Sequence, residues 1–133
     1  MLPEKELEKL CRGRLIYAEV YNSIHNCPAG PHWLVMIDST AKIKLSIEFN
    51  CVVATHNTAI ESRFLVPFPA GYGLDDQTFI SCGFGQKIHE LAIKKVGAEL
   101  PFATMKKVQE QVAIAFVVKE QEEQKRRKKS TQS

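Results

Sequence analysis

The chain has 133 residues, of which 44% are hydrophobic and 25% are charged, as expected for one domain with its own core. No apolar run is long enough to cross a bilayer, and the charged start MLPEKELEKL is not a secretory signal, so we expect a cytoplasmic protein without a membrane partner. Residues 119–133 hold six basic and three acidic side chains, whereas residues 1–118 hold twelve of each sign. The net charge of +3 therefore lies entirely in residues 119–133. This distribution predicts a neutral single domain over 1–118 and a charged, disordered tail over 119–133.

The first half of the chain is rich in β patterns. Residues 3–11 predict a short helix, and residues 14–21 predict a strand with alternating faces. Residues 32–38 (HWLVMID) are nearly all apolar and predict a strand covered on both sides. Residues 42–49 alternate apolar and polar side chains and predict a half-exposed strand. Residues 51–55 (CVVAT) predict another buried strand.

The second half continues with short strands. Residues 63–68 suit an edge strand because prolines stand at positions 67 and 69. Residues 78–82 predict a strand, and the glycines that follow it, Gly83 and Gly85, predict a bend. Residues 94–98 predict the last strand.

A helix is predicted to close the fold. Pro101 suits its first turn, where the missing N–H costs nothing. Its apolar face recurs at steps of three or four residues: Phe102, Met105, Val108, Val112 and Phe116. We therefore predict a mainly β protein. Its fold is a small SH3-like barrel of six or seven short strands, closed by a C-terminal α-helix and preceded by a short N-terminal helix.

The cysteines indicate neither a metal site nor a disulfide framework. Cys11, Cys27, Cys51 and Cys82 lie far apart, and no CxxC pair is present. His25 and Cys27 are the nearest approach to paired ligands. Since structural zinc sites have closely spaced ligand pairs, we expect reduced thiols, no metal and no cofactor.

The pattern of the whole domain resembles the MazF/PemK toxin family, which includes relatives of the CcdB type. Residues 73–112 (GLDDQTFISCGFGQKIHELAIKKVGAELPFATMKKVQEQV) look like that family's closing strands and helix, the helix being written roughly PEDMKKVDEAL. Residues 12–20 (RGRLIYAEV) are similar to the opening strand GDVYFADL. Residues 31–37 (PHWLVMI) are similar to RPVLVI. The resemblance spans about residues 12–116.

The resemblance implies a homodimeric toxin of a toxin–antitoxin system that cleaves single-stranded RNA without metal. Thr55 matches the family's functional threonine, and His32 falls where the family has its arginine. These two are the expected catalytic residues, because an imidazole titrates near neutral pH and serves proton transfer. Around Ser81, where several members carry an arginine or an acidic residue, this chain has neither. That departure leaves open a catalytically inactive member that binds an antitoxin-like peptide, another protein or RNA.

The expected substrate-binding residues are His56, Arg63, Trp33 and Ser81. Two of them also have a plainer interpretation: Trp33 is either a stacking platform for a base or a core residue, and Arg63 is either a phosphate ligand or a solvated edge residue. The basic run at residues 125–129 suits either RNA binding or a solubilising tail.

Overall fold

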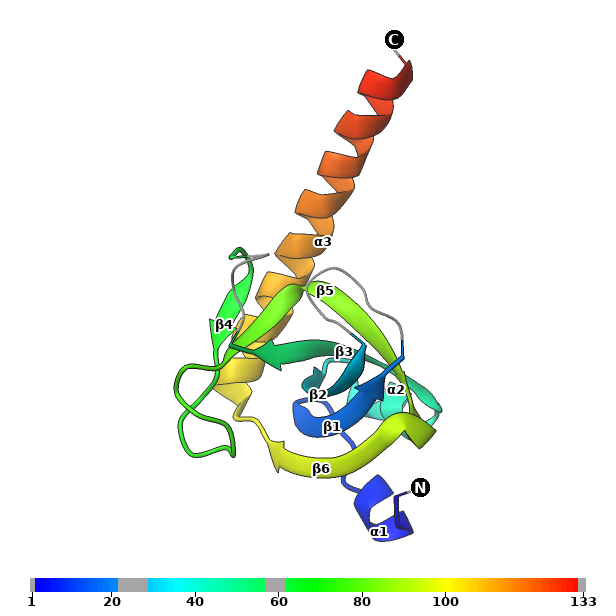
Figure 1. The fold of residues 1–133 in the computed structure, drawn as a ribbon, viewed down its shortest axis with the longest axis vertical. Helices are drawn as coiled ribbons and strands as arrows, with labels where there is room; N and C mark the ends of the chain where they lie inside the picture. The colour runs from blue at the N-terminus through cyan, green and yellow to red at the C-terminus, as the bar shows by residue number, and fades with distance from the viewer. Residues whose placement is uncertain (1, 22–28, 57–61, 132–133) are drawn as a thin grey trace.

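One strongly curved antiparallel sheet organises the protein (Figure 1). The computed structural model describes residues 2–21, 29–56 and 62–131. Within them the strand order is β4-β5-β3-β2-β1-β6. The strands are β1 Arg14–Val20, β2 Gly30–Met36, β3 Glu48–Thr55, β4 Leu65–Pro67, β5 Phe79–His89 and β6 Ile93–Glu99. The helices are α1 Glu4–Leu7, α2 Thr40–Lys44 and α3 Phe102–Thr131, with a 3-10 turn, η1, at Glu90–Ala92.

The mainly β class, the six strands, and the short N-terminal and the C-terminal helix are confirmed. The sheet is open, with β4 and β6 as its two edges. β4 is only three residues long and contains Pro67, which has no N–H to donate to a further strand. The strand that pairs with it, β5, is longer than predicted and bends where its register against β3 shifts, between Val52 and Val53. That shift falls opposite Gly83 and Gly85, where the sequence predicts a bend.

The prediction of a strand over residues 42–49 is wrong. Residues 40–44 form α2, whose N-cap is Ser39: its hydroxyl oxygen accepts a hydrogen bond of 3.2 Å from the Lys42 amide. Ile43 is the residue of this short helix that enters the core, and Leu45 is left exposed. The alternating residues 42–49 therefore belong to two elements: the end of α2 and the start of β3 at Glu48.

Two apolar clusters cover the two faces of the sheet. Alternate residues of the central strands enter opposite clusters, so that Leu34 joins one and Val35 joins the other. The first cluster takes Leu10 from the segment after α1, and the second takes Val108 from α3. Burial on both faces explains why residues 32–38 and 51–55 are so uniformly apolar, as predicted.

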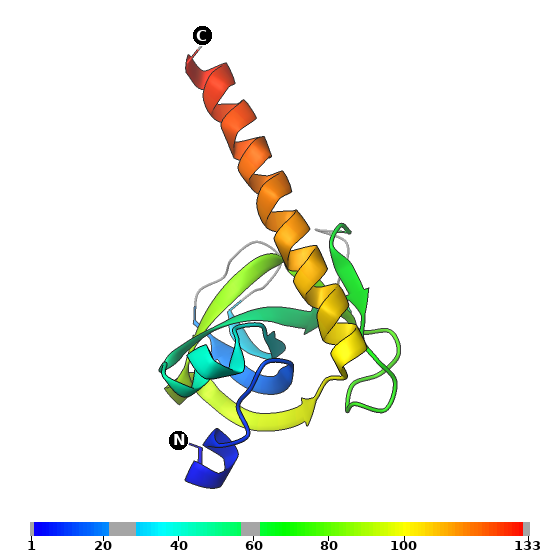
Figure 2. The same ribbon diagram turned by 180° about the vertical axis from the view of Figure 1, so that it is seen from behind.

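The helix α3 packs against β5 and β4, and its contacts with β5 reach Lys119, whose ammonium lies 3.7 Å from the centre of the Phe84 ring. Met105, Val108 and Ala115 are buried, whereas Phe102 and Phe116, predicted on the buried face, are exposed. The helix does not end at Val118: it continues to Thr131 and stands clear of the sheet (Figures 1 and 2). Ion pairs one turn apart, such as Glu123 with Arg126, support this extension. None of the described helices combines the length and apolar content needed to cross a membrane.

Candidate functional site

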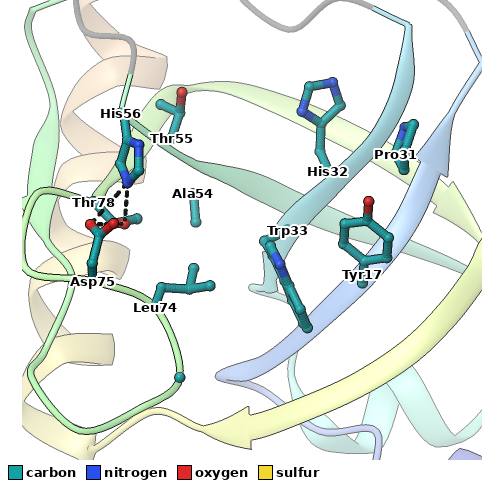
Figure 3. A pocket seen from close by; sticks show the side chains of 11 residues that line it. Tyr17, Pro31, His32, Trp33, Ala54, Thr55, His56, Leu74, Asp75 and Thr78 are labelled. Carbon is teal, nitrogen blue, oxygen red and sulfur yellow. Dashed lines mark hydrogen bonds and ion pairs between the residues drawn. The ribbon is translucent and has the colours of Figure 1, made fainter.

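A cavity of about 570 Å³ opens at one rim of the sheet, where β2 begins and β3 ends (Figure 3). The segment that connects β4 to β5 forms its opposite wall. The lining residues are Tyr17, Pro31, His32, Trp33, Ala54, Thr55, His56, Gly73, Leu74, Asp75 and Thr78. Polar groups capable of proton transfer and phosphate contact thus share one hollow with two aromatic rings.

The strand register brings His32 and Thr55 to the same cavity. In the antiparallel pairing of β2 with β3, Leu34 stands opposite Val53. Continued by two residues, this register sets His32 against Thr55, and both side chains line the upper rim of the cavity in Figure 3. The two expected catalytic residues therefore line the same cavity.

An aromatic pair forms the floor on the β1 side. The rings of Tyr17 and Trp33, from paired positions of β1 and β2, have centroids 5.0 Å apart at an interplanar angle of 50°. Trp33 also packs against the second apolar cluster, so it is partly core and partly cavity wall, and its stacking on a base stays a prediction. The ammonium of Lys95 lies 5.6 Å from the centre of the Tyr17 ring, which adds a cation near this wall.

On the opposite wall, His56 is held by a carboxylate and a hydroxyl. Its Nε2 lies 2.9 Å from Asp75 Oδ1 and 3.1 Å from Thr78 Oγ1. The Thr78 hydroxyl donates to the same Asp75 oxygen over 3.1 Å, and the Gln77 amide donates to it over 3.0 Å. Because a carboxylate oxygen only accepts, Nε2 carries the hydrogen and Nδ1 is the nitrogen left to exchange a proton with a substrate.

These contacts keep Asp75 ionised. Desolvation acts to raise the pKa of its carboxyl, but the hydrogen bonds from Gln77, Thr78 and His56 outweigh that effect and hold the pKa below its ordinary value. At neutral pH the Asp75 carboxylate is therefore a fixed acceptor that orients the His56 ring.

Two of the predicted substrate-binding residues lie away from the cavity. Arg63 forms a 2.7 Å ion pair with Glu122 of α3 and lies over the Phe64 ring, so its guanidinium braces the helix. Ser81 is 1% exposed in the middle of β5, where it pairs with Val53, and a ligand in the cavity has no access to it. Neither residue is part of the cavity lining.

Sequence reasoning missed Asp75, Thr78 and Tyr17. The segment 70–77 reads only as a glycine-rich turn, although the spacing in Asp-Asp-Gln-Thr is that of an Asx turn whose carboxylate accepts from residues two and three positions later. That signal predicts a local turn but not its partner His56, which is nineteen residues away. Among the described residues, no three potential ligand side chains converge in a way that fits a metal ion. The candidate ligands His25 and Cys27 lie outside the described residues.

Comparison with known proteins rests on structure alone, since no family's sequence pattern and no curated protein sequence matches this chain. MazF from Deinococcus radiodurans superposes with a TM-score of 0.66 at 14% identity, over 80% of this chain and 96% of that chain. The chain has the MazF fold. An endoribonuclease from a mycobacterial species gives a TM-score of 0.64 at 13% identity, over 80% and 90% of the two chains. The MazF-mt6 toxin of Mycobacterium tuberculosis gives 0.63 at 15% identity, over 77% and 95%.

Similar MazF structures include complexes with antitoxins. One is an endoribonuclease bound to its cognate antitoxin, at a TM-score of 0.63 and 14% identity. The expected likeness to MazF is therefore confirmed at the level of the fold.

Proposed function

We propose that this protein is a cytoplasmic toxin-like endoribonuclease of a toxin–antitoxin system, and that it cleaves single-stranded RNA in the cavity without a metal ion. The observation that carries the proposal is the presence of two imidazoles on opposite walls of one hollow, His32 on β2 and His56 after β3. Cleavage of RNA by its own 2′-hydroxyl needs two proton-transfer groups and donors around the phosphate. The MazF fold supports the same conclusion.

The reaction follows from these groups. His32 takes the proton of the ribose 2′-hydroxyl, whose oxygen then bonds to the adjacent phosphorus. The bond from phosphorus to the 5′ oxygen breaks, and the protonated His56 gives its Nδ1 proton to that leaving oxygen. The products are a 2′,3′-cyclic phosphate and a 5′-hydroxyl, so protons and bonds balance. The hydroxyl of Thr55 donates to a phosphate oxygen, and Trp33 stacks a base.

Asp75 is a positioning residue in this scheme. Its carboxylate at 2.9 Å from Nε2 holds the His56 ring with Nδ1 available to the substrate, as the hydrogen bond at one ring nitrogen fixes the role of the other. Replacement by asparagine keeps the shape of Asp75 and removes its charge.

The test is cleavage of a mixed-sequence RNA by the pure protein in EDTA. We expect His32→Ala and His56→Ala each to slow cleavage by about 10²–10⁴-fold, the range that one acid–base group contributes. Asp75→Asn should slow it by about tenfold or more and change the pH profile, which a purely structural role of Asp75 would leave in place. The control is His89→Asn, since His89 accepts the Leu91 amide as an N-cap outside the cavity and asparagine is an equally good cap.

Intact RNA at micromolar protein would refute the nuclease, and so would equal cleavage by the His32→Ala variant. A requirement for a divalent ion would refute the metal-independent chemistry. Loss of activity in the His89→Asn control as large as in His56→Ala would show that the effects arise from folding.

A binding module without nuclease activity is the alternative, and one observation favours it. The cavity lining contains neither arginine nor lysine, and Asp75 adds a negative charge that repels phosphate. In this case the partner we propose is an antitoxin-like peptide, in keeping with the antitoxin complexes among the similar structures. Co-expression with the product of an adjacent short reading frame tests it: a stable complex together with no RNA cleavage supports this alternative, and robust cleavage removes it.

The homodimer is proposed on a separate feature. An apolar groove of about 530 Å³ lies between β5 and α3, with Val112, Ala115 and the exposed Phe116 along it. A second copy of the chain is its proposed occupant. Light scattering should give twice the chain mass for the wild type and the single mass for Phe116→Glu. A monomeric wild type would refute this part without affecting the nuclease.

A further inference from the structure

The second half of α3 has the shape of an arm. Its last buried residue is Ala115, and the Arg63–Glu122 ion pair joins the next turns to the segment before β4. From there to Thr131 the helix points away from the sheet in both views (Figures 1 and 2). At about 1.5 Å per residue, the stretch after Glu122 extends roughly 13 Å.

Positive charge is concentrated at the end of this arm. Residues 125–129 are five consecutive lysines and arginines, and residues 124–131 contain no carboxylate. The side chains of Arg126 and Arg127 are 75% and 78% exposed, and both face the single carboxylate of Glu123, at 3.0 and 3.4 Å. Residues 123–131 hold five basic side chains and one carboxylate, so this stretch carries a net positive charge. Because residues 1–118 have no net charge, the net charge of +3 comes from residues 119–133, and residues 125–129 are its positive part.

The placement of these charges selects among anionic partners. Successive residues of a helix are about 100° apart, so five in a row point in every direction around the axis. A flat anionic surface meets only the part of such a ring that faces it. A flexible single-stranded polyanion can follow the ring around the helix, and guanidinium groups contact phosphates in a bidentate manner.

We propose that residues 125–129 form a second RNA-binding site, an electrostatic arm that holds single-stranded RNA by its phosphates independently of sequence. The choice of RNA as the polymer rests on the proposed function. The arm raises the local concentration of RNA around the domain, while base contacts and chemistry take place in the cavity. The cavity includes the negatively charged Asp75 and does not by itself supply this affinity for a polyanion. The basic arm supplies it to a domain that is otherwise neutral.

The experiment uses a fluorescent 2′-O-methyl RNA of about 20 nucleotides, long enough to cover the arm and unable to be cleaved through a 2′-hydroxyl. Binding to the full chain is measured by anisotropy in EDTA between about 50 and 200 mM salt. In the arm variant, all five basic residues at 125–129 are replaced by glutamine, which preserves helix propensity. The control variant removes five exposed lysines elsewhere by the same substitution: Lys5, Lys44, Lys87, Lys106 and Lys107.

For the wild type, five phosphate contacts predict a slope of log affinity against log salt of about −3.5, which is about a hundredfold loss of affinity across that range. The arm variant should bind at least tenfold more weakly at the low-salt end, with a slope close to zero. The control variant, with the same net charge, should retain most of the affinity and the slope. Circular dichroism verifies that both variants are folded.

Equal weakening in the two variants would overturn the site, because net charge alone would then explain binding. Wild-type affinity in the arm variant would overturn it as well. Arm-dependent binding to vesicles with anionic lipid, with RNA binding unchanged in the arm variant, would assign the arm to membranes instead. Arm-dependent RNA binding without cleavage of ordinary RNA would refute the proposed nuclease and leave the arm in place. Cleavage without arm-dependent binding would refute the arm and leave the proposed nuclease in place.

Discussion

The junction between the first strand and α3 depends on Gly13, and Gly13→Ala tests that dependence. Gly13 has a φ of +88°, donates its amide to the Met36 carbonyl at 2.8 Å and accepts from the Leu100 amide at 2.9 Å. A Cβ at this position would lie 2.9 Å from Cγ of Met105, a buried residue of α3. Two separate costs are therefore expected.

The first cost is conformational, since a left-handed backbone costs an L-residue about 1–2 kcal/mol. The second is steric: forcing one extra carbon into a packed site costs about 1–3 kcal/mol, and the flexibility of methionine keeps it near the lower end. Together they predict a loss of about 2–4 kcal/mol from a total stability on the order of 5–15 kcal/mol. The melting temperature should fall by about 10 °C.

Urea unfolding followed by Trp33 fluorescence measures this loss, with Gly85→Ala as the control. A Cβ at Gly85 meets no atom within 4 Å, and its φ is not in the left-handed region, so that variant should unfold within about 1 kcal/mol of the wild type. In a Met105→Ala background the steric part disappears, and Gly13→Ala should cost only the conformational 1–2 kcal/mol or so. Equal stability of the Gly13 and Gly85 variants would refute the reasoning.

Two further predictions concern ionisable groups outside the cavity. The Asp38 carboxylate accepts the Asn50 amide at 2.8 Å and its side-chain N–H at 3.0 Å, so Asp38→Ala should lower the free energy of unfolding at pH 7 by about 1–3 kcal/mol. Desolvation acts to raise the pKa of Asp38, but the Asn50 and Lys42 contacts outweigh it and the pKa lies below 3.8, its ordinary value. The contribution is therefore complete above that value and is lost as pH falls through the folded-state pKa, so acid titration of unfolding should bring wild type and variant together; a constant difference down to strong acid would contradict it. For the thiols, burial raises the pKa of Cys82 to about 12 and that of Cys51 further, so mass spectrometry should find both unalkylated at pH 8 in the folded protein and modified in urea; rapid native labelling would contradict their burial.

Local sequence patterns were sufficient to predict strands where both faces of the sheet are buried, because such strands are almost entirely apolar. Residues 32–38 and 51–55 are apolar because the sheet has a cluster on each side, and so their β character is visible in the sequence. The alternation at residues 42–49 misled, because a period of two over a few residues does not exclude a helical turn. There the N-cap at Ser39 and the burial of Ile43 favour α2.

The sequence identified some residues of the candidate site and not others. His32 and Thr55 are expected from the family resemblance alone, and the antiparallel register of β2 with β3 brings both to one cavity. Ser81 lies outside the cavity because both faces of the sheet are covered at its position in β5, which local pattern does not reveal. Arg63 was misplaced because its partner Glu122 lies on a helix that the sequence did not extend so far.

The sequence by itself determined the β-rich class, the order of most strands, and the separation of a neutral domain from a basic terminal segment, since these follow from local periodicity and from counting charges. Only the tertiary structure decided that the sheet stays open, that Asp75 and Thr78 hold His56, and that the basic segment continues α3 away from the domain. The physical reason is the sequence distance over which each feature is set. Periodicity is local and indicates which face of an element is buried, whereas the contact between His56 and Asp75 depends on how a whole loop folds back over the sheet.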